Sequence, residues 1–155
     1  MNAESHNFKQ LKREILQLSI SAEWEAARLE WQLSHIFDND EPETCLCSHF
    51  PIIEICVLIN IKNGNSAEVG NVCVKRFLGI RSDRVFSCVK RVRGDLTKAP
   101  NAETIELLYQ QRLISAWERE FSFDTLRKRL LTARQIAKRK EINQKILSNI
   151  VRARV

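Results

Sequence analysis

The sequence predicts a mainly α-helical fold in which a small zinc-stapled β-hairpin, a ββα-like finger, is inserted between N-terminal and C-terminal helices. Apolar residues recur at helical spacing at both ends of the chain. Between them, an Asn63-Gly64 turn follows an apolar run, and cysteines stand on both sides of that turn. The 155 residues suit a single domain, with N-terminal helices over 1–44, a zinc-finger-like module over 45–79 and a helical region over 80–155.

Two helices are expected in the N-terminal part. Residues 7–19 carry apolar side chains near helical spacing, and Ser21 opens a second helical stretch. The residues that would share one face of this second helix are Trp24, Ala27, Trp31 and His35. We expect Trp24 and Trp31 to be largely buried, either in the core of this chain or against a second copy, because two exposed indoles would form an unusual apolar patch.

The finger itself is expected to contain two strands and a short helix. Residues 53–62 are rich in β-branched side chains, and both Asn63 and Gly64 are expected to adopt positive φ in a tight hairpin turn. A return strand over 67–69 then leads to a helix over 72–78 that ends at Gly79.

Helices are expected to fill the rest of the chain. The expected segments are 85–92, a helix starting at Pro100-Asn101, its continuation over 113–121, and a last helix opened by the capping box Thr132-x-x-Gln135. Ile136, Ile142, Ile146 and Ile150 would lie on one side of the last helix.

Three cysteines and a histidine form the strongest chemical pattern in the chain. Cys45, Cys47 and His49 are spaced by two, so in an extended segment they would point to one side. Cys73 follows at the expected start of a helix, where the dipole favours a thiolate. Thiolate and imidazole are the ligands that structural Zn²⁺ prefers, so these four residues predict a zinc site, with Cys56 as the alternative fourth ligand.

Other roles for the five cysteines remain open at this point. Cysteine is often a small buried hydrophobe, and Cys88 fits that description best. Disulfides are disfavoured, because the cysteine count is odd and the N-terminus is polar and resembles no signal peptide. A cytoplasmic protein without a membrane segment is expected, since no apolar run approaches the ~20 residues that a spanning helix needs.

The block CLCSHFPIIEICVLINIKNGNSAEVGNVCVKRFLG, residues 45–79, resembles a zinc-finger-like pattern in small uncharacterised proteins of bacteriophages and other bacterial mobile elements. That pattern reads C-x-C-G-x-x-I, an apolar strand, an asparagine, a turn, then V-G-x-x-C and a short basic-aromatic helix. The matching residues are Cys45, Cys47, Ile52 or Ile53, Asn60, Asn63-Gly64, Val69, Gly70, Cys73 and Phe77.

The resemblance departs from the pattern at Ser48, which replaces the usual glycine, so the turn must be tighter or differently bonded. Residues 113–147 resemble a tail seen behind this finger, and the two segments cover somewhat under half of the chain. The resemblance implies zinc and a phage or mobile-element origin, in a bacterial host cytosol. It implies no reaction.

Positive charge gathers in two blocks. Residues 71–98 carry a net charge of +6, and residues 127–155 carry +9. Such blocks are typical of proteins that bind phosphate backbones. The residues predicted to bind nucleic acid are Lys75, Arg76, Arg81, Arg84, Lys90, Arg91 and Arg93. Five of them, Lys75, Arg76, Arg81, Lys90 and Arg91, are expected to form one contiguous surface beside the zinc site. The second block has alternatives: it can face and neutralise the acidic N-terminal helices, or be a solvated face or a frayed tail.

No catalytic pattern is present, because the chain lacks a phosphate loop, a GxSxG elbow and an HExxH helix. The sequence therefore predicts a small, non-catalytic zinc protein that binds DNA or RNA. The alternative is a protein-interaction module, such as an anti-defence inhibitor or a host-factor modulator, that docks on a host protein or nucleoprotein complex.

Overall fold

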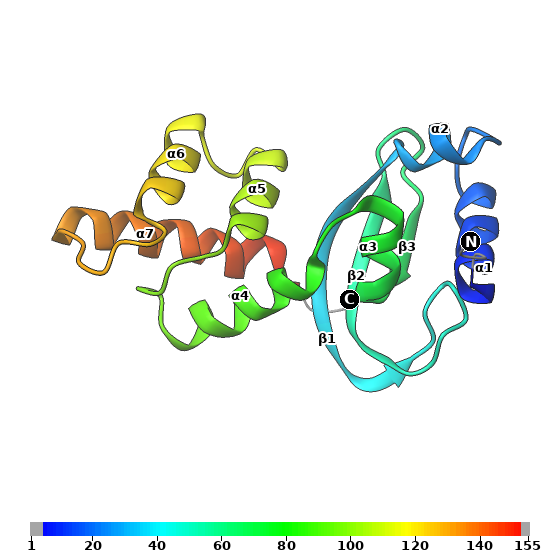
Figure 1. Ribbon diagram of the computed structural model, residues 1–155, viewed down its shortest axis with the longest axis horizontal. Coiled ribbons are helices and arrows are strands. Elements are labelled where there is room, and N and C mark those ends of the chain that lie inside the picture. The colour runs from blue at the N-terminus through cyan, green and yellow to red at the C-terminus, as the bar shows by residue number, and fades with distance from the viewer. Residues whose placement is uncertain (1–4, 153–155) are drawn as a thin grey trace. The chain divides into compact units, whose positions relative to one another are not determined.

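A computed structural model describes residues 5–152, which form two compact units, 5–81 and 82–152 (Figure 1). The first unit contains α1 (His6–Gln17), α2 (Trp24–Arg28), β1 (Trp31–Glu43), β2 (Ile52–Asn60), β3 (Ser66–Val69) and α3 (Asn71–Leu78). The second contains α4 (Ser82–Gly94), α5 (Ala102–Gln110), α6 (Ala116–Thr125), α7 (Ala133–Lys145) and the π-helix η1 (Ile146–Ile150). About half of the chain is helical, beside one small antiparallel sheet, which agrees with the predicted class at this level.

The second predicted helix is wrong beyond Arg28. α2 ends there, and β1 takes the place of the expected helical face. Trp31 and Leu33 are buried and alternate with half-buried neighbours, which is the period of a strand. β1 pairs along β2, and this pairing satisfies backbone groups at an edge of β2 that would otherwise lack partners. The N-terminal part is therefore not wholly helical.

The sheet has the order β1-β2-β3, so the predicted hairpin of β2 and β3 is its second half. The predicted two-residue turn is wrong in detail: only Gly64 has positive φ, at 78°. Asn60 organises the longer loop instead, because its backbone N–H donates to the Asn65 carbonyl at 2.8 Å and its side-chain oxygen accepts from Lys62 N at 2.9 Å.

A buried carboxylate joins the start of β1 to the end of β2. Glu30 accepts hydrogen bonds from the side-chain amide of Asn60 at 2.8 Å and from the backbone N–H groups of Ile20 and Ser21 at 2.8 and 3.0 Å. These donors, the Asn60 amide foremost, hold the pKa of Glu30 below its usual range. The carboxylate therefore fixes the chain between α1 and the sheet.

Phe77 of α3 is the centre of the first unit's aromatic core. Its ring is fully buried, with the ring of Trp24 at 5.2 Å and that of Trp31 at 6.2 Å between centroids. Trp31 is buried as predicted, and Trp24 is half-buried. The two indoles thus meet on one phenylalanine, although they do not share a helix. α3 packs on β2 and against α1.

The second unit is built only of helices, and its caps follow the sequence. Thr132 and Gln135 form the predicted capping box at the start of α7. Asn101 caps α5 by accepting a hydrogen bond from Thr104 N at 3.1 Å. α6 begins later than expected, after a capping box formed by Ser115 and Glu118. The fully or nearly fully buried apolar side chains of the second unit include Val85, Phe86, Cys88, Val89, Val92, Ile105, Leu108, Ile142, Ile146 and Ile150.

None of the helices described between residues 5 and 152 combines the length and the apolar character required to cross a membrane.

Candidate metal centre

The first two cysteines lie in a tight turn rather than in the extended segment that was predicted. Ser48 N donates to the Cys45 carbonyl at 2.8 Å, and Cys45 N donates to the His49 carbonyl at 2.8 Å. Ser48 adopts the left-handed conformation, with φ of 76°. Glycine adopts that region without strain, so the conformation explains why the zinc-finger-like pattern has a glycine where this chain has Ser48.

Cys73 reaches the turn from the other side of the β2–β3 hairpin. β3 ends at Val69, Gly70 precedes the first residue of α3, and Cys73 follows in the first turn of that helix. A Cβ atom on Gly70 would lie 3.1 Å from Cγ2 of Ile52, so a residue without a side chain suits this close approach. Gly70 N also donates to the Cys45 sulfur at 3.3 Å.

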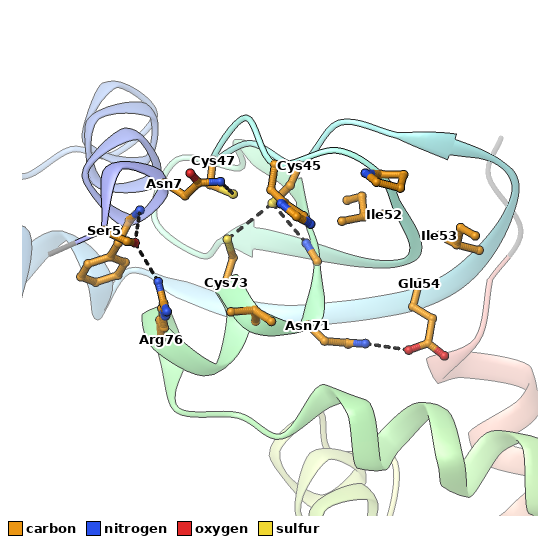
Figure 2. A pocket seen from close by; sticks show the side chains of 15 residues that line it. Ser5, Asn7, Cys45, Cys47, Ile52, Ile53, Glu54, Asn71, Cys73 and Arg76 are labelled. Carbon is orange, nitrogen blue, oxygen red and sulfur yellow. Dashed lines mark hydrogen bonds between the residues drawn. The ribbon is translucent and has the colours of Figure 1, made fainter.

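The three sulfurs of Cys45, Cys47 and Cys73 lie within 4.8 Å of one another and point together in Figure 2. All three residues are buried, with exposed fractions of 3, 2 and 7%. The Cys45 and Cys73 sulfurs are 3.5 Å apart, much farther than the ~2.05 Å of a disulfide. Tetrahedral zinc with bonds of about 2.3 Å to sulfur separates its thiolates by about 3.8 Å. The cluster thus has the donors and nearly the spacing of a thiolate metal site.

The thiols also bias one another's protonation. Contact with the Cys73 thiol lowers the pKa of Cys45 to about 5, against the opposing effect of burial, and the backbone N–H groups of Cys47 and Gly70 contribute. The same contact, together with burial, raises the pKa of Cys73. A divalent cation would remove this competition for protons, because it stabilises every thiolate that it binds.

Neither of the two residues predicted as a fourth ligand belongs to the three-sulfur cluster. The side chain of His49 is exposed. Among the described residues it does not belong to the group of possible metal ligands, so its binding of a metal stays a prediction. Cys56 is fully buried in β2 and is also outside the group, and its sulfur donates to the Asn71 side-chain oxygen at 3.4 Å. Cys88, the cysteine assigned to packing, is fully buried in α4.

A pocket of about 650 Å³ adjoins the cluster. All three cysteines and His49 line it, and apolar side chains form much of the rest of its wall. Its other lining residues are Ser5, Asn7, Phe8, Pro51, Ile52, Ile53, Glu54, Gly70, Asn71, Val72 and Arg76. A metal held by the three thiols would therefore border this pocket.

Sequence reasoning missed two polar contacts at the pocket. The amide of Asn7 lies 3.7 Å from the Cys47 sulfur, and the amide of Asn71 donates to Glu54 at 2.7 Å (Figure 2). Asn7 comes from α1, about forty residues earlier, and no local pattern connects it with the cysteines. Asn71 lies inside the V-G-x-x-C segment but at a position that the pattern leaves open.

The seven predicted phosphate-binding residues divide between the two units. Lys75, Arg76 and Arg81 belong to the unit that contains the thiols, and Arg84, Lys90, Arg91 and Arg93 belong to α4. All are exposed except Arg81, which is half-exposed. The contiguous surface expected of Lys75, Arg76, Arg81, Lys90 and Arg91 stays a prediction.

Several of these cations have intramolecular partners. Arg76 donates to the Ser5 hydroxyl at 2.8 Å, Arg84 lies 3.6 Å from Glu103, and Arg91 donates twice to the Ala99 carbonyl at 3.1 and 2.9 Å. These bonds orient the guanidinium groups while other donors stay exposed to solvent.

The C-terminal basic block is partly used inside the second unit. Lys138 and Lys145 lie 3.1 and 3.6 Å from the buried carboxylate of Glu118. Arg139 is buried and donates to the carbonyls of Thr97 and Thr125 at 3.2 and 2.6 Å. Internal neutralisation therefore accounts for part of the block, with α6 supplying the carboxylate.

No protein-family model, no curated protein and no solved structure matches this chain.

Proposed function

We propose that this chain is a small, non-catalytic zinc protein that binds nucleic acid through phosphate contacts, in the cytosol of a bacterial host of phages or mobile elements. Zinc is held by Cys45, Cys47 and Cys73, with His49 as the fourth ligand. The metal has a structural task, because its ligands join the turn before β2 to the first turn of α3. The resemblance of residues 45–79 to phage and mobile-element proteins supports the origin.

The zinc part of the proposal is supported by the burial and convergence of three thiols from both sides of one hairpin. A single uncharged cysteine in a hydrophobic core is common and does not indicate a metal. Three within 4.8 Å, in one unit, are a donor set that soft metals prefer. Two of them lie two residues apart in a turn closed by backbone hydrogen bonds, which positions both sulfurs before any metal arrives.

The nucleic-acid part rests chiefly on one observation: positive charge is concentrated in the second unit. Residues 82–152 hold 16 Lys and Arg against eight Asp and Glu, whereas residues 5–81 hold eight against ten. α4 exposes four of these cations along its outer side, with Asp83 as its one exposed acidic residue. A helix with such a face can follow a phosphate backbone without reading bases.

The test is the affinity of the purified full chain for generic duplex and single-stranded oligonucleotides as a function of salt. The proposal predicts binding at low salt that weakens steeply as salt rises, with little preference among sequences. Lack of binding at low salt would contradict it, and so would an affinity that does not change with salt. Comparison of DNA with RNA of one sequence identifies the nucleic acid.

A second candidate function is docking on a host protein. The observation that favours it is a set of exposed apolar side chains near the pocket: Phe50, Ile53 and Val72 are 60, 52 and 65% exposed. A capture experiment from host lysate with and without nuclease separates the two functions. A stoichiometric protein partner that survives nuclease and high salt would favour docking over nucleic-acid binding.

A further inference from the structure

The three thiols and His49 differ sharply in their surroundings. Cys45, Cys47 and Cys73 are almost completely buried, and the backbone holds two of them: Gly70 N donates to the Cys45 sulfur, and the turn at Ser48 fixes Cys45 relative to Cys47. The side chain of His49 is exposed and stands outside the sulfur cluster. Three coordination positions are thus preorganised and the fourth is not.

The pocket supplies space at this fourth position. It has a volume of about 650 Å³, and all four candidate ligands line it. Binding pockets for small molecules are mostly apolar with a few placed polar groups. Here Phe8, Ile52 and Val72 supply apolar wall, while the polar ends of Glu54 and Arg76 are held by Asn71 and Ser5, as Figure 2 shows.

Charge selects the kind of donor that the fourth position accepts. A divalent cation with three thiolates carries a net charge of −1, so a further anion must overcome repulsion within a partly desolvated site, which a strong thiolate donor does in all-cysteine zinc sites and a weaker anion does less well. A neutral nitrogen donor, such as an imidazole ring, adds no charge and is a good ligand of zinc.

We propose that the fourth coordination position of this metal centre is exchangeable and takes a small ligand with a neutral nitrogen donor from the pocket, in competition with His49. This inference rests on the proposed zinc centre. It adds a binding site to a centre that would otherwise only join two segments of the chain. An external ligand that replaces His49 releases the side chain of that histidine, while the three thiols keep the metal and the backbone hydrogen bonds keep the turn.

The test uses the full chain with cobalt in place of zinc, because Co²⁺ accepts similar ligands and its visible absorption reports changes in coordination. Imidazole is the probe, and azide is the anionic comparison. We expect imidazole to shift the cobalt bands in a saturable way, and azide to do so more weakly. His49→Ala should keep one cobalt and bind imidazole about tenfold more tightly, if His49 fills the position nine-tenths of the time. His6→Ala, an exposed histidine outside the pocket, is the matched control and should behave like the parent.

The outcomes separate the inference from the proposed function. Failure of the parent protein to bind cobalt or zinc refutes the metal centre itself. Cobalt bands that imidazole leaves unchanged in both the parent and His49→Ala overturn the exchangeable position and leave the metal centre standing. Tighter binding of azide than of imidazole overturns the choice of a neutral donor.

Discussion

The sulfur atoms of Cys45 and Cys73 lie 3.5 Å apart, although 28 residues separate them along the chain. The β2–β3 hairpin between them brings the turn at Cys45 back to the start of α3, and Gly70 allows the close approach to Ile52 at that junction. The hairpin is thus the element that turns two short cysteine-containing segments into one cluster.

Replacing Ser48 with glycine should stabilise the protein by about 1 kcal/mol. Ser48 has φ of 76°, a conformation that strains an L-residue with a side chain and leaves glycine unstrained. Chemical denaturation of the metal-free protein measures the change. Ser87→Gly, on the exposed side of α4, is the control and should destabilise by a few tenths of a kcal/mol to about 0.5. A loss of stability in Ser48→Gly would contradict the left-handed turn.

Replacing Phe77 with alanine should destabilise the protein by about 3–5 kcal/mol, because it removes a fully buried ring between Trp24 and Trp31. Their fluorescence should shift to longer wavelength as water reaches the indoles. Val72→Ala changes a side chain of the same helix that is 65% exposed, and should alter stability by no more than about 0.5 kcal/mol. Equal effects of the two substitutions would contradict the packing described for α3.

The metal-free protein should gain stability as the pH rises from about 5 to about 8.5. The pKa of Cys45 is lowered to about 5 in the folded state, below the ordinary thiol value of about 8.5. Between these values the unfolded chain binds more protons, so the free energy of unfolding rises with pH, and this stability is lost as pH falls through 5. Above the ordinary thiol value the raised pKa of Cys73 reverses the trend.

Urea unfolding with chelator and reductant at several pH values measures this dependence. Cys45→Ser should flatten the rise, whereas Cys88→Ala, in the other unit, should retain it. A stability that falls between pH 6 and 8 in the parent would show that Cys45 is not the thiolate of the cluster.

Substituting Lys90 and Arg93 together with alanine should weaken nucleic-acid binding for all sequences and make the log-log salt slope shallower by about two units, one for each phosphate contact. Both side chains are exposed on α4. The matched control is Lys9→Ala with Lys62→Ala, which removes the same charge from exposed positions of the first unit. If the two double variants lose affinity equally, α4 is not the binding face. Lys75→Ala with Arg76→Ala tests α3 in the same way.

Local sequence signals predicted most of the second unit, and in the first unit they predicted β3 and α3. The capping box at Thr132 and the cap at Asn101 mark helix starts, because these side chains satisfy backbone N–H groups that a helix leaves unpaired. Gly79 ends α3 as predicted, with φ of 71°. Such signals lie within a few residues of the boundary that they determine.

The errors have long-range causes. Trp31 and His35 fit a helical face with Trp24 and Ala27, whereas Trp31 and Leu33 alternate as in a strand, and only pairing with β2, more than twenty residues later, decides for the strand. The carboxylate of Glu30 is buried because Asn60 and two backbone donors meet it, which no local pattern shows. For the cluster, the thiol set could be predicted from donor chemistry and the hairpin signal. The contact of Asn7 with Cys47 could not, because it depends on how α1 packs.

Metal analysis of the protein purified without chelator tests the central claim most directly. Native mass spectrometry with elemental analysis should find one zinc per chain, and Cys73→Ser should lose it and lower the free energy of unfolding of the first unit, because metal binding in such a site contributes folding free energy. Cys88→Ala should keep one zinc. The absence of stoichiometric metal from the parent protein, or its full retention in Cys73→Ser, would contradict the account.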